Sequence, residues 1–427
     1  MSAFITTLTI ISLLLFIQVC YSTYLKLYTW NDANRRNKYR APSVFIAPQK
    51  SFTVLLPARH EEEVIQQTIQ GVLDTNYPQD LLEIAVICRV DDEGTIAKVR
   101  EKLAALESQG VTNVRLIIFG DTPINKPHGC NVGLRYTRNE VVTLFDAEDQ
   151  VHPDIFNVVN TVMVNEGFSV VQAGVQLMNF DSRWFSAHNV LEYFFWFKSS
   201  LYYYAELGMI PLGGNTVFFS RWLLSLLGGW DETCLTEDAD IGMRLSLRSE
   251  RVRVVYEDAY VTKEETPPTI SQFIKQRSRW NQGFFQILRR GDYKRLPRLR
   301  QRLLAFYTLS SPIFQAVTML YLPISIYTIV YVKMATWLAM LLCLPAYMLI
   351  GQFLLNLIGL HEFADAHGIR LQPLTWLKLL LTFYPYQVLL GVGAMRAVYR
   401  ELKGVNTWEK TKHVNAHRNA AIAPTHR

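Results

Sequence analysis

The chain is poor in charged residues and in cysteine. Only 19% of its 427 residues are charged, against about 25% in a typical soluble domain, whereas 50% are hydrophobic. Its five cysteines are scattered without CxxC or metal-ligand spacing, which is evidence against a disulfide framework and indicates a reducing compartment. There is also no internal repeat and no low-complexity region.

The scarcity of charge is uneven along the chain. Residues 50–270 have the composition of a soluble α/β protein, whereas the first 25 residues and most of residues 303–398 are apolar. The length exceeds that of one ordinary domain. A soluble domain attached to membrane segments is therefore the first-order description.

The N-terminal segment lacks the basic residues of a secretory signal. Residues 3–20 carry no charge, and Met1 and Ser2 add none, so residues 1–25 are predicted to form a membrane-anchoring helix. Basic residues stay on the cytoplasmic side, so the N-terminus is expected outside and the polar linker 26–50 inside. Five basic residues follow the predicted helix: Lys26, Arg35, Arg36, Lys38 and Arg40.

Residues 303–398 are predicted to form transmembrane or interfacial helices. Three crossings from a cytoplasmic domain would place the basic tail 399–427 outside, against the usual charge rule. One stretch is therefore expected not to cross the membrane. The candidates are 303–313, as an interfacial helix before the span, and 376–398, which Pro385 divides. Each of the three apolar stretches is long enough for a hydrocarbon layer of about 30 Å: 303–332, 334–360 and 376–398.

The basic segment 286–302 immediately precedes these apolar stretches. It is expected to lie at the membrane interface, where basic side chains contact anionic headgroups. A nucleic-acid partner is not expected, because the basic runs adjoin hydrophobic segments and contain no recognisable nucleic-acid module.

Residues 51–285 alternate between strand-like and helix-like segments, which predicts an α/β domain with a mostly parallel sheet. Polar groups follow the strands at Arg59-His60-Glu61, Asp91-Asp92 and Asp146–Asp149. Open α/β sheets bind ligands at this edge. The predicted strands are Ser51–Leu56, Leu82–Val90, Val114–Phe119 and Val141–Phe145, and the predicted helices are Glu61–Leu73, Thr95–Ser108 and Gly129–Thr137.

Asp146-Ala147-Glu148 is a D-x-E element at a strand end. Two carboxylates so placed suit a hard divalent cation such as Mg²⁺ or Mn²⁺, which takes oxygen ligands and often phosphates as well. Such a cation would neutralise a leaving diphosphate. Taken alone, the motif is weak, because acidic residues are common in surface turns.

Thr236-Glu237-Asp238 precedes an apolar-patterned segment. One carboxylate here can act as a general base toward an acceptor hydroxyl. The other interpretation is helix capping, with Thr236 as N-cap and the two acids in the first turn. Both can hold together, since a cap fixes the position of the carboxylate.

Gln276-Arg277-Ser278-Arg279-Trp280 follows 38 residues after Asp238 (276 − 238). Guanidinium groups bind phosphate oxygens through paired hydrogen bonds, and an indole stacks on the apolar face of a sugar. The alternative is a basic and aromatic belt next to the membrane.

The order and spacing of these motifs, from Asp91-Asp92 to Trp280, resemble the D, DxD, TED and QxxRW signature of family-2 glycosyltransferases. Within that family the chain resembles the membrane-bound synthases of cellulose, hyaluronan and chitin and bacterial exopolysaccharide relatives. The resemblance implies a GT-A fold, with a Rossmann-like, mostly parallel sheet over residues 51–285. It also implies a nucleotide-sugar donor, expected to be a UDP-sugar.

The resemblance assigns roles to individual residues. The donor nucleotide is expected to contact Asp91 or Asp92, Lys126, Asn131, Asp146, Arg279 and Lys410, the last in a W-x-K-T-x-H-like element, Trp408–His413. Asp146 and Glu148 are expected to bind the metal. The acceptor is expected to contact Gly213, Gly214, Asn215, Gln276 and Trp280. Asp238 is the expected general base, beside Glu237.

Three positions depart from the family pattern. Glu148 replaces the usual second Asp of DxD, His60 stands where an Asn is usual, and Asn215 replaces the Thr of the GGT loop. His60 is accordingly a polar contact, an extra ligand or simply a hydrogen-bonded side chain. The third departure makes it harder to infer the identity of the acceptor from the family.

The sequence therefore predicts an inverting, metal-dependent glycosyltransferase that forms β-linkages on a growing polysaccharide at the membrane. The alternative is addition of one or a few sugars to a membrane lipid. A non-catalytic scaffold or transporter is a distant third, because every catalytic position holds a suitable group. A channel of three or four spans would be narrow, so a partner subunit or homo-oligomer is also considered.

Overall fold

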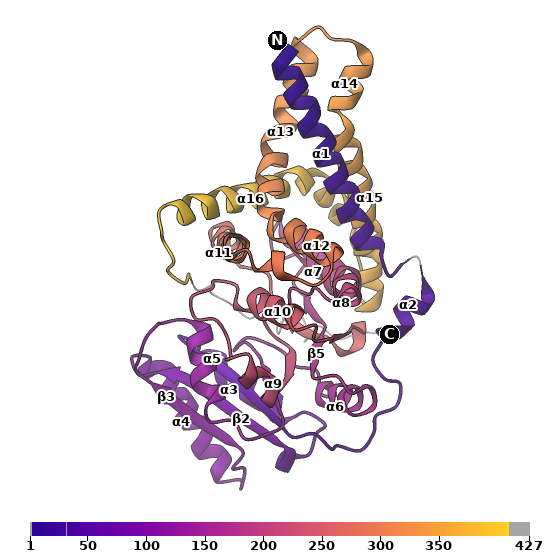
Figure 1. The fold of residues 1–427 in the computed structure, drawn as a ribbon. Coiled ribbons are helices and arrows are strands. Elements are labelled where there is room, and N and C mark those ends of the chain that lie inside the picture. The colour runs from indigo at the N-terminus through magenta and orange to yellow at the C-terminus, as the bar shows by residue number, and fades with distance from the viewer. Residues whose placement is uncertain (1, 31, 410–427) are drawn as a thin grey trace.

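The structure is a computed structural model, and it describes residues 2–30 and 32–409. Figure 1 shows an α/β body beneath an upright group of apolar helices, with the polar linker running down one side. The linker includes α2 (Ala33–Lys38), whose N-cap Asp32 accepts hydrogen bonds from the amides of Asn34 and Arg35.

A seven-stranded sheet forms the body, in the order β3-β2-β1-β4-β7-β5-β8. All neighbours are parallel except β7, which runs antiparallel to both β4 and β5. A second, two-stranded parallel sheet pairs β6 with β9. The strands are β1 (Phe52–Ala58), β2 (Leu82–Arg89), β3 (Val114–Phe119), β4 (Val141–Leu144), β5 (Val170–Ala173), β6 (Val175–Leu177), β7 (Val217–Ser220), β8 (Val252–Val255) and β9 (Thr262–Glu264).

Helices cover both faces of this sheet, so its central strands are buried on both sides and their sequences are almost continuously apolar. The α-helices of the body are α3 (Ile65–Leu73), α4 (Glu93–Glu107), α5 (Lys126–Leu134), α6 (Ile155–Glu166), α7 (Ser186–Phe195), α8 (Leu201–Leu207), α9 (Arg221–Leu226), α10 (Glu237–Leu247) and α11 (Ile270–Arg290). A π-helical turn, Trp196–Ser200, joins α7 to α8, and short 3₁₀ turns lie at Gln79–Leu81, Asp258–Tyr260 and Asp292–Arg295.

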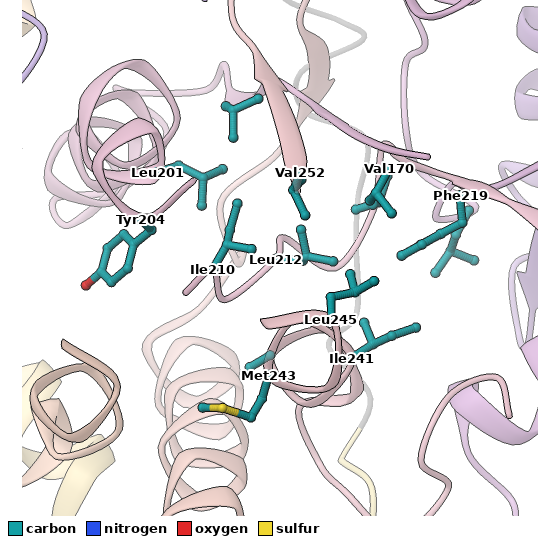
Figure 2. Packing of buried hydrophobic residues seen from close by; sticks show 14 of the residues in the cluster. Val170, Leu201, Tyr204, Ile210, Leu212, Phe219, Ile241, Met243, Leu245 and Val252 are labelled. Atoms are coloured by element: carbon teal, nitrogen blue, oxygen red, sulfur yellow. The ribbon is translucent and has the colours of Figure 1, made fainter. Parts of the chain in front are cut away.

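Helix α10 is fixed by a buried cluster beneath the sheet. Figure 2 shows Ile241 and Leu245 of α10 close to the sheet residues Val170 and Phe219, with Leu212 between them. These side chains are nearly or wholly buried. Because α10 begins at Glu237, this packing determines where the predicted acidic pair lies.

The first four predicted strands are confirmed, each to within a few residues. Two helix starts are wrong. The first helix begins at Ile65 rather than Glu61, because the acidic residues form a turn whose Glu61 carbonyl accepts the amides of Val64 and Ile65. The third begins at Lys126 rather than Gly129, because the Asn125 side chain caps the helix at His128.

The apolar segments form α1 (Ser2–Leu27), α12 (Leu299–Leu309), α13 (Ser311–Tyr331), α14 (Thr336–Leu342), α15 (Leu344–Ala366) and α16 (Pro373–Leu402). The expected stretches 303–332 and 334–360 are each divided. The breaks fall at Ser310 and Cys343, and Pro312 and Pro345 occupy the first turn of the next helix, where proline is tolerated.

Four described helices, α1, α13, α15 and α16, are long and apolar enough to cross a membrane. Figure 1 shows α1, α13 and α15 running alongside one another, whereas α16 lies across the foot of this group. There α16 packs against α11 and α13. A Cβ at Gly393 of α16 would lie 2.9 Å from the Arg277 Cβ of α11, so the two backbones approach closely.

The part of the bundle farthest from the sheet is filled by side chains. Leu8 and Leu15 of α1 pack with Tyr321, Leu322, Leu342 and Leu349. The Ser12 hydroxyl donates to the Leu341 carbonyl at 2.6 Å, and the Tyr321 hydroxyl donates to that of Leu342 at 2.9 Å. These contacts hold α1, α13 and α14 together at that end.

Replacing Gly242 of α10 with Ala tests the packing that positions the acidic pair. A Cβ there would lie 2.1 Å from the Ile210 carbonyl oxygen and 3.0 Å from the Leu212 amide nitrogen, both backbone atoms. We expect Gly242→Ala to lower stability by about 1–3 kcal/mol, measured by thermal unfolding in detergent. Gly71→Ala in α3 is the control, since a Cβ there meets nothing within 4 Å. Equal melting of the two variants would contradict this account.

Candidate active site

A continuous cavity of about 840 Å³ opens at the carboxyl edge of β1, β2 and β4. Arg59, Arg89 and Phe119 line it near the sheet, together with the acidic motifs. Residues of the long apolar helices also line it, including Gln18 of α1 and Gln315 of α13. The volume is in the range of ligand sites in proteins.

The loop after β4 presents Asp146 and Glu148 to this cavity. Asp149, which is buried, accepts a hydrogen bond from the Asp146 amide at 2.8 Å. The Thr68 hydroxyl of α3 donates to the Ala147 carbonyl on the other side of the loop. The backbone of the D-x-E element is therefore held from two sides.

Lys126 connects this loop to its neighbours. Its ammonium group forms an ion pair with Asp146 and donates to the Gly214 carbonyl at 3.3 Å. Burial alone would lower the pKa of Lys126, but the Asp146 and Glu237 carboxylates raise it above its ordinary value. Lys126 is thus a permanent positive charge at the centre of the cavity.

The donor set of Asp146 and Glu148 fits a divalent cation. Both supply carboxylate oxygens to the cavity, where phosphate oxygens can complete the ligand set. Among the described residues, the only group of three metal-ligating side chains within 4.8 Å of one another is His60, Glu62 and Asp92. Asp92 there already accepts the amides of His60 and Thr95, which makes it a structural cap.

The Gly213–Asn215 loop lies beside the acidic motifs. The Gly213 amide donates to the Gln172 Oε1 atom at 2.7 Å. The Asn215 amide group donates to Asp149 at 2.8 Å and also to Glu264. Burial and the Glu264 charge raise the pKa of Asp149 well above its usual range. Asn215 therefore holds the buried Asp149 and the half-buried Glu264 next to the D-x-E element.

Thr236 is the N-cap of α10, as predicted, but its side chain makes no capping hydrogen bond. Asp238 instead accepts the Ala239 amide at 2.8 Å, in the first helical turn, where the helix dipole favours a negative charge. A Cβ at Gly283 of α11 would lie 2.2 Å from the Thr236 Oγ1 atom. The absence of a side chain at Gly283 lets α11 approach the acidic turn.

The two acids of this turn have raised pKa values. Burial, then the Asp238 charge, raises the pKa of Glu237 to about 7, although Lys126 and Arg279 oppose the shift. Burial also raises the pKa of Asp238. An acid with a raised pKa is a stronger base when ionised, which suits proton abstraction.

The two arginines of the Gln276–Trp280 motif differ in their environment. Arg277 forms an ion pair with Glu192, hydrogen-bonds Asn189 at 2.5 Å and lies 4.8 Å from the Trp280 ring, so it is a structural cation. Both arginines line the cavity, and the buried Nε of each has no hydrogen-bond partner within the described residues, but Arg279 forms no ion pair with a described carboxylate. Of the two, Arg279 is available to a phosphate.

The segment after α16 returns to the site. Trp408 lines the cavity and stacks on the Arg279 guanidinium at 4.4 Å. It is held by Arg400, which donates to the Thr407 carbonyl at 2.8 Å, and by an Arg396–Glu409 ion pair at 2.7 Å. The predicted donor contact Lys410 lies outside the described residues.

Eleven of the predicted site residues line one cavity. Asp91, Asp92 and Asn131 do not belong to this lining as described. Asp91 pairs with Arg89 at 2.5 Å, and Asn131 holds the loop before α10 through Trp230 and Glu232. The eleven are Lys126, Asp146, Glu148, Gly213, Gly214, Asn215, Glu237, Asp238, Gln276, Arg279 and Trp280.

Many cavity residues were missed from the sequence, among them Arg89, Phe119, Tyr193 and Glu264. Arg89 could have been found, because it lies two positions before Asp91 at a strand end. Phe119 likewise ends a predicted strand, Val114–Phe119, whereas Tyr193 and Glu264 carry no such signal because they lie outside the predicted strands and motifs. The Tyr193 ring lies 6.5 Å from that of Trp280, and the two rings form an aromatic wall on the predicted acceptor side.

The profile of the family described as "Glycosyltransferase like family 2" matches residues 48–283. The chain is 27% identical over 236 residues to a beta-monoglucosyldiacylglycerol synthase of Nostoc sp., covering 55% of this chain and 49% of that protein. It is 26% identical over 250 residues to glucomannan 4-beta-mannosyltransferase 2 of Arabidopsis thaliana, covering 56% and 45%. The chain thus spans about half the length of these relatives.

The fold is similar to that of the mannosyltransferase PcManGT from Pyrobaculum calidifontis, solved in complex with GDP-Man and Mn²⁺. The TM-score is 0.54 at 20% identity, covering 92% of this chain and 99% of that one. This likeness shows that the α/β body and the apolar helices occur together in one known architecture.

The raised pKa values predict the pH profile of any reaction that uses Asp238 as a base. The base must be ionised, so kcat/KM should fall as the pH drops through the pKa of Asp238, which burial raises above its ordinary value. Glu237→Gln removes a negative charge beside Asp238, lowers its pKa and should move this acid limb down by roughly one pH unit. The control is Glu107→Gln, at the exposed end of α4, which should leave the acid limb of the pH profile unchanged. A limb that moves upward in Glu237→Gln would contradict the assignment.

Proposed function

The chain belongs to the glycosyltransferase-like family 2, and on that premise we propose that it transfers a sugar from a nucleotide sugar, with inversion, to a hydroxyl group of a membrane lipid. The donor is expected to be UDP-linked. The observation that carries the proposal is the single cavity that joins Asp238 and the D-x-E loop to the membrane helices α1 and α13.

In the proposed reaction, the Asp238 carboxylate accepts the proton of the acceptor hydroxyl. The hydroxyl oxygen forms a bond to the anomeric carbon as the bond from that carbon to the diphosphate oxygen breaks. The electron pair of the broken bond leaves with the nucleoside diphosphate. A single displacement inverts the anomeric configuration, so an α-linked donor gives a β-linked product, and no covalent intermediate forms.

Positive charge for the leaving diphosphate comes from residues on two sides of the cavity. Lys126 lies beside the D-x-E loop, and Arg279, stacked on Trp408, lies opposite it on α11. Paired hydrogen bonds from a guanidinium to phosphate are stronger than neutral ones. A divalent cation, Mg²⁺ or Mn²⁺, held by Asp146 and Glu148 would supply further neutralisation when bound.

The shape of the bundle favours a lipid acceptor. The cavity lining includes Gln18 and Gln315 but none of the apolar side chains that fill the far end of the bundle. The described helices therefore leave a binding position for the acceptor at one end of the bundle, but no channel through the bundle for a polymer. A lipid headgroup needs no such route.

A growing polysaccharide is the second candidate acceptor. The Trp280 and Tyr193 rings favour it, because aromatic side chains stack on sugars. Transfer of a polymer across the membrane would then require a partner subunit or a homo-oligomer. Product length on a gel separates the two candidates.

The proposed orientation places the N-terminus outside and the α/β body in the cytoplasm. Three crossings by α1, α13 and α15, with α16 lying in the interface, return the chain to the cytoplasmic side. This arrangement agrees with the basic residues of the linker and of the segment 399–409, and with the contacts of Trp408 at the cavity.

The first test is release of nucleoside diphosphate from a panel of nucleotide sugars by the purified full chain in lipid. We expect release from one donor, at least tenfold faster with Mg²⁺ or Mn²⁺ than with chelator. Asp146→Asn should weaken this metal dependence. Equal release with and without metal would remove the cation from the proposal, and no release from any donor would remove the reaction itself.

The second test is Asp238→Asn. We expect transfer to fall by about 10²–10⁴-fold, because the base is lost while shape is retained. Nucleotide binding, measured by titration calorimetry, should stay within a few-fold of the unchanged protein. Asp231→Asn, which alters an acid paired with Arg290 outside the cavity, is the control. Near-normal turnover in Asp238→Asn would require another base.

A further inference from the structure

We infer that the membrane end of the cavity binds the phosphate of an anionic lipid headgroup, and that Lys26 is the residue that recognises it. This inference rests on the proposed function and narrows its acceptor to a lipid that carries both a phosphate and a free hydroxyl.

Lys26 lies in the last turn of α1 and lines the cavity. Its side chain is partly buried, and its ammonium group lies 5.4 Å from the centre of the Phe195 ring. Within the described part of the chain, no carboxylate lies within ion-pair distance of it and it makes no hydrogen bond. A cation at this depth is stabilised by a nearby anion.

The carboxylate whose charge acts on Lys26 is Glu192, and it is already engaged. Glu192 forms an ion pair with Arg277 and accepts the Tyr386 hydroxyl at 2.6 Å. The Glu192 charge is therefore already neutralised by Arg277, and the Tyr386 hydroxyl adds a hydrogen bond. The positive charge of Lys26 remains unbalanced. A ligand that brings one negative charge would balance it.

Polar groups from two membrane helices surround the same end of the cavity. Gln18 and Ser22 line it from α1, and Ser311 and Gln315 line it from α13. Ser22 also accepts a hydrogen bond from Gln352 of α15 at 2.6 Å, which fixes it at the helix interface. Amides and hydroxyls can hydrogen-bond the oxygens and hydroxyls of a headgroup, whereas acyl chains offer them no hydrogen bond.

The general base restricts the ligand further. A phosphate oxygen that attacked the donor itself would carry no proton for Asp238 to remove. The acceptor therefore presents a hydroxyl at Asp238 and its phosphate at Lys26. The rival explanation is that Lys26 extends toward the headgroup layer as lysines near helix ends commonly do, which predicts no dependence of transfer on acceptor charge.

The test compares two lipids in phosphatidylcholine vesicles that contain the full-length protein: phosphatidylglycerol, which has a phosphate and free hydroxyls, and neutral diacylglycerol. Transfer of labelled sugar is measured over a range of acceptor concentrations. We expect Lys26→Gln to raise KM for phosphatidylglycerol by about tenfold, with kcat nearly unchanged, because one charge-assisted contact is lost. Lys26→Arg should retain most of the affinity.

The matched control is Arg36→Gln in α2, which removes an exposed cation outside the cavity lining and should change neither acceptor's KM. Inorganic phosphate and glycerophosphoglycerol, added in solution, distinguish free phosphate from lipid. Competition by phosphate alone, without transfer to phosphatidylglycerol, would overturn the lipid assignment.

Two further results separate this inference from the function on which it rests. Transfer to diacylglycerol alone, or an equal loss with both lipids in Lys26→Gln, would overturn the role of Lys26 and leave lipid glycosylation standing. Donor consumption that yields only long polymer, with no labelled lipid, would overturn the proposed function itself.

Discussion

The contact of the Lys126 ammonium group with the Asp146 carboxylate is the interaction on which the site depends. It joins the start of α5 to the loop after β4, and its second contact, to Gly214, adds the loop before β7. Its charge also opposes the raised pKa of Glu237 at the start of α10. One cation thus connects four segments that are distant in the sequence, and a substitution there would disturb all of them.

The motifs and the first half of the sheet could be predicted because their signals are local. β1 and β2 are seven and eight residues long and almost continuously apolar, and each is followed by charged residues. β5 to β9 were not predicted, since they have three or four residues and β7 enters the sheet antiparallel. Sequence order could not distinguish Arg277 from Arg279, because the difference lies in Glu192, a partner 85 residues away.

The membrane helices and the catalytic motifs are joined through α11 and α16. Gly393 lets α16 approach Arg277, and Gln282 of α11 accepts a hydrogen bond from Arg400 of α16 at 2.9 Å. On its other face, α11 meets the acidic turn at Gly283. The length and periodicity of 376–398 predicted a helix, but its direction across the bundle follows from these close contacts, which no local pattern encodes.

The filled far end of the bundle has a consequence for membrane asymmetry. Leu15, Tyr321 and Leu342 occupy the space through which a product would have to pass. In the proposed orientation, a glycolipid made by the proposed reaction would therefore stay in the cytoplasmic leaflet and accumulate on one side only. Its appearance on the opposite leaflet would require a separate flippase, so synthesis and export of such a lipid would be distinct steps that a cell can control independently.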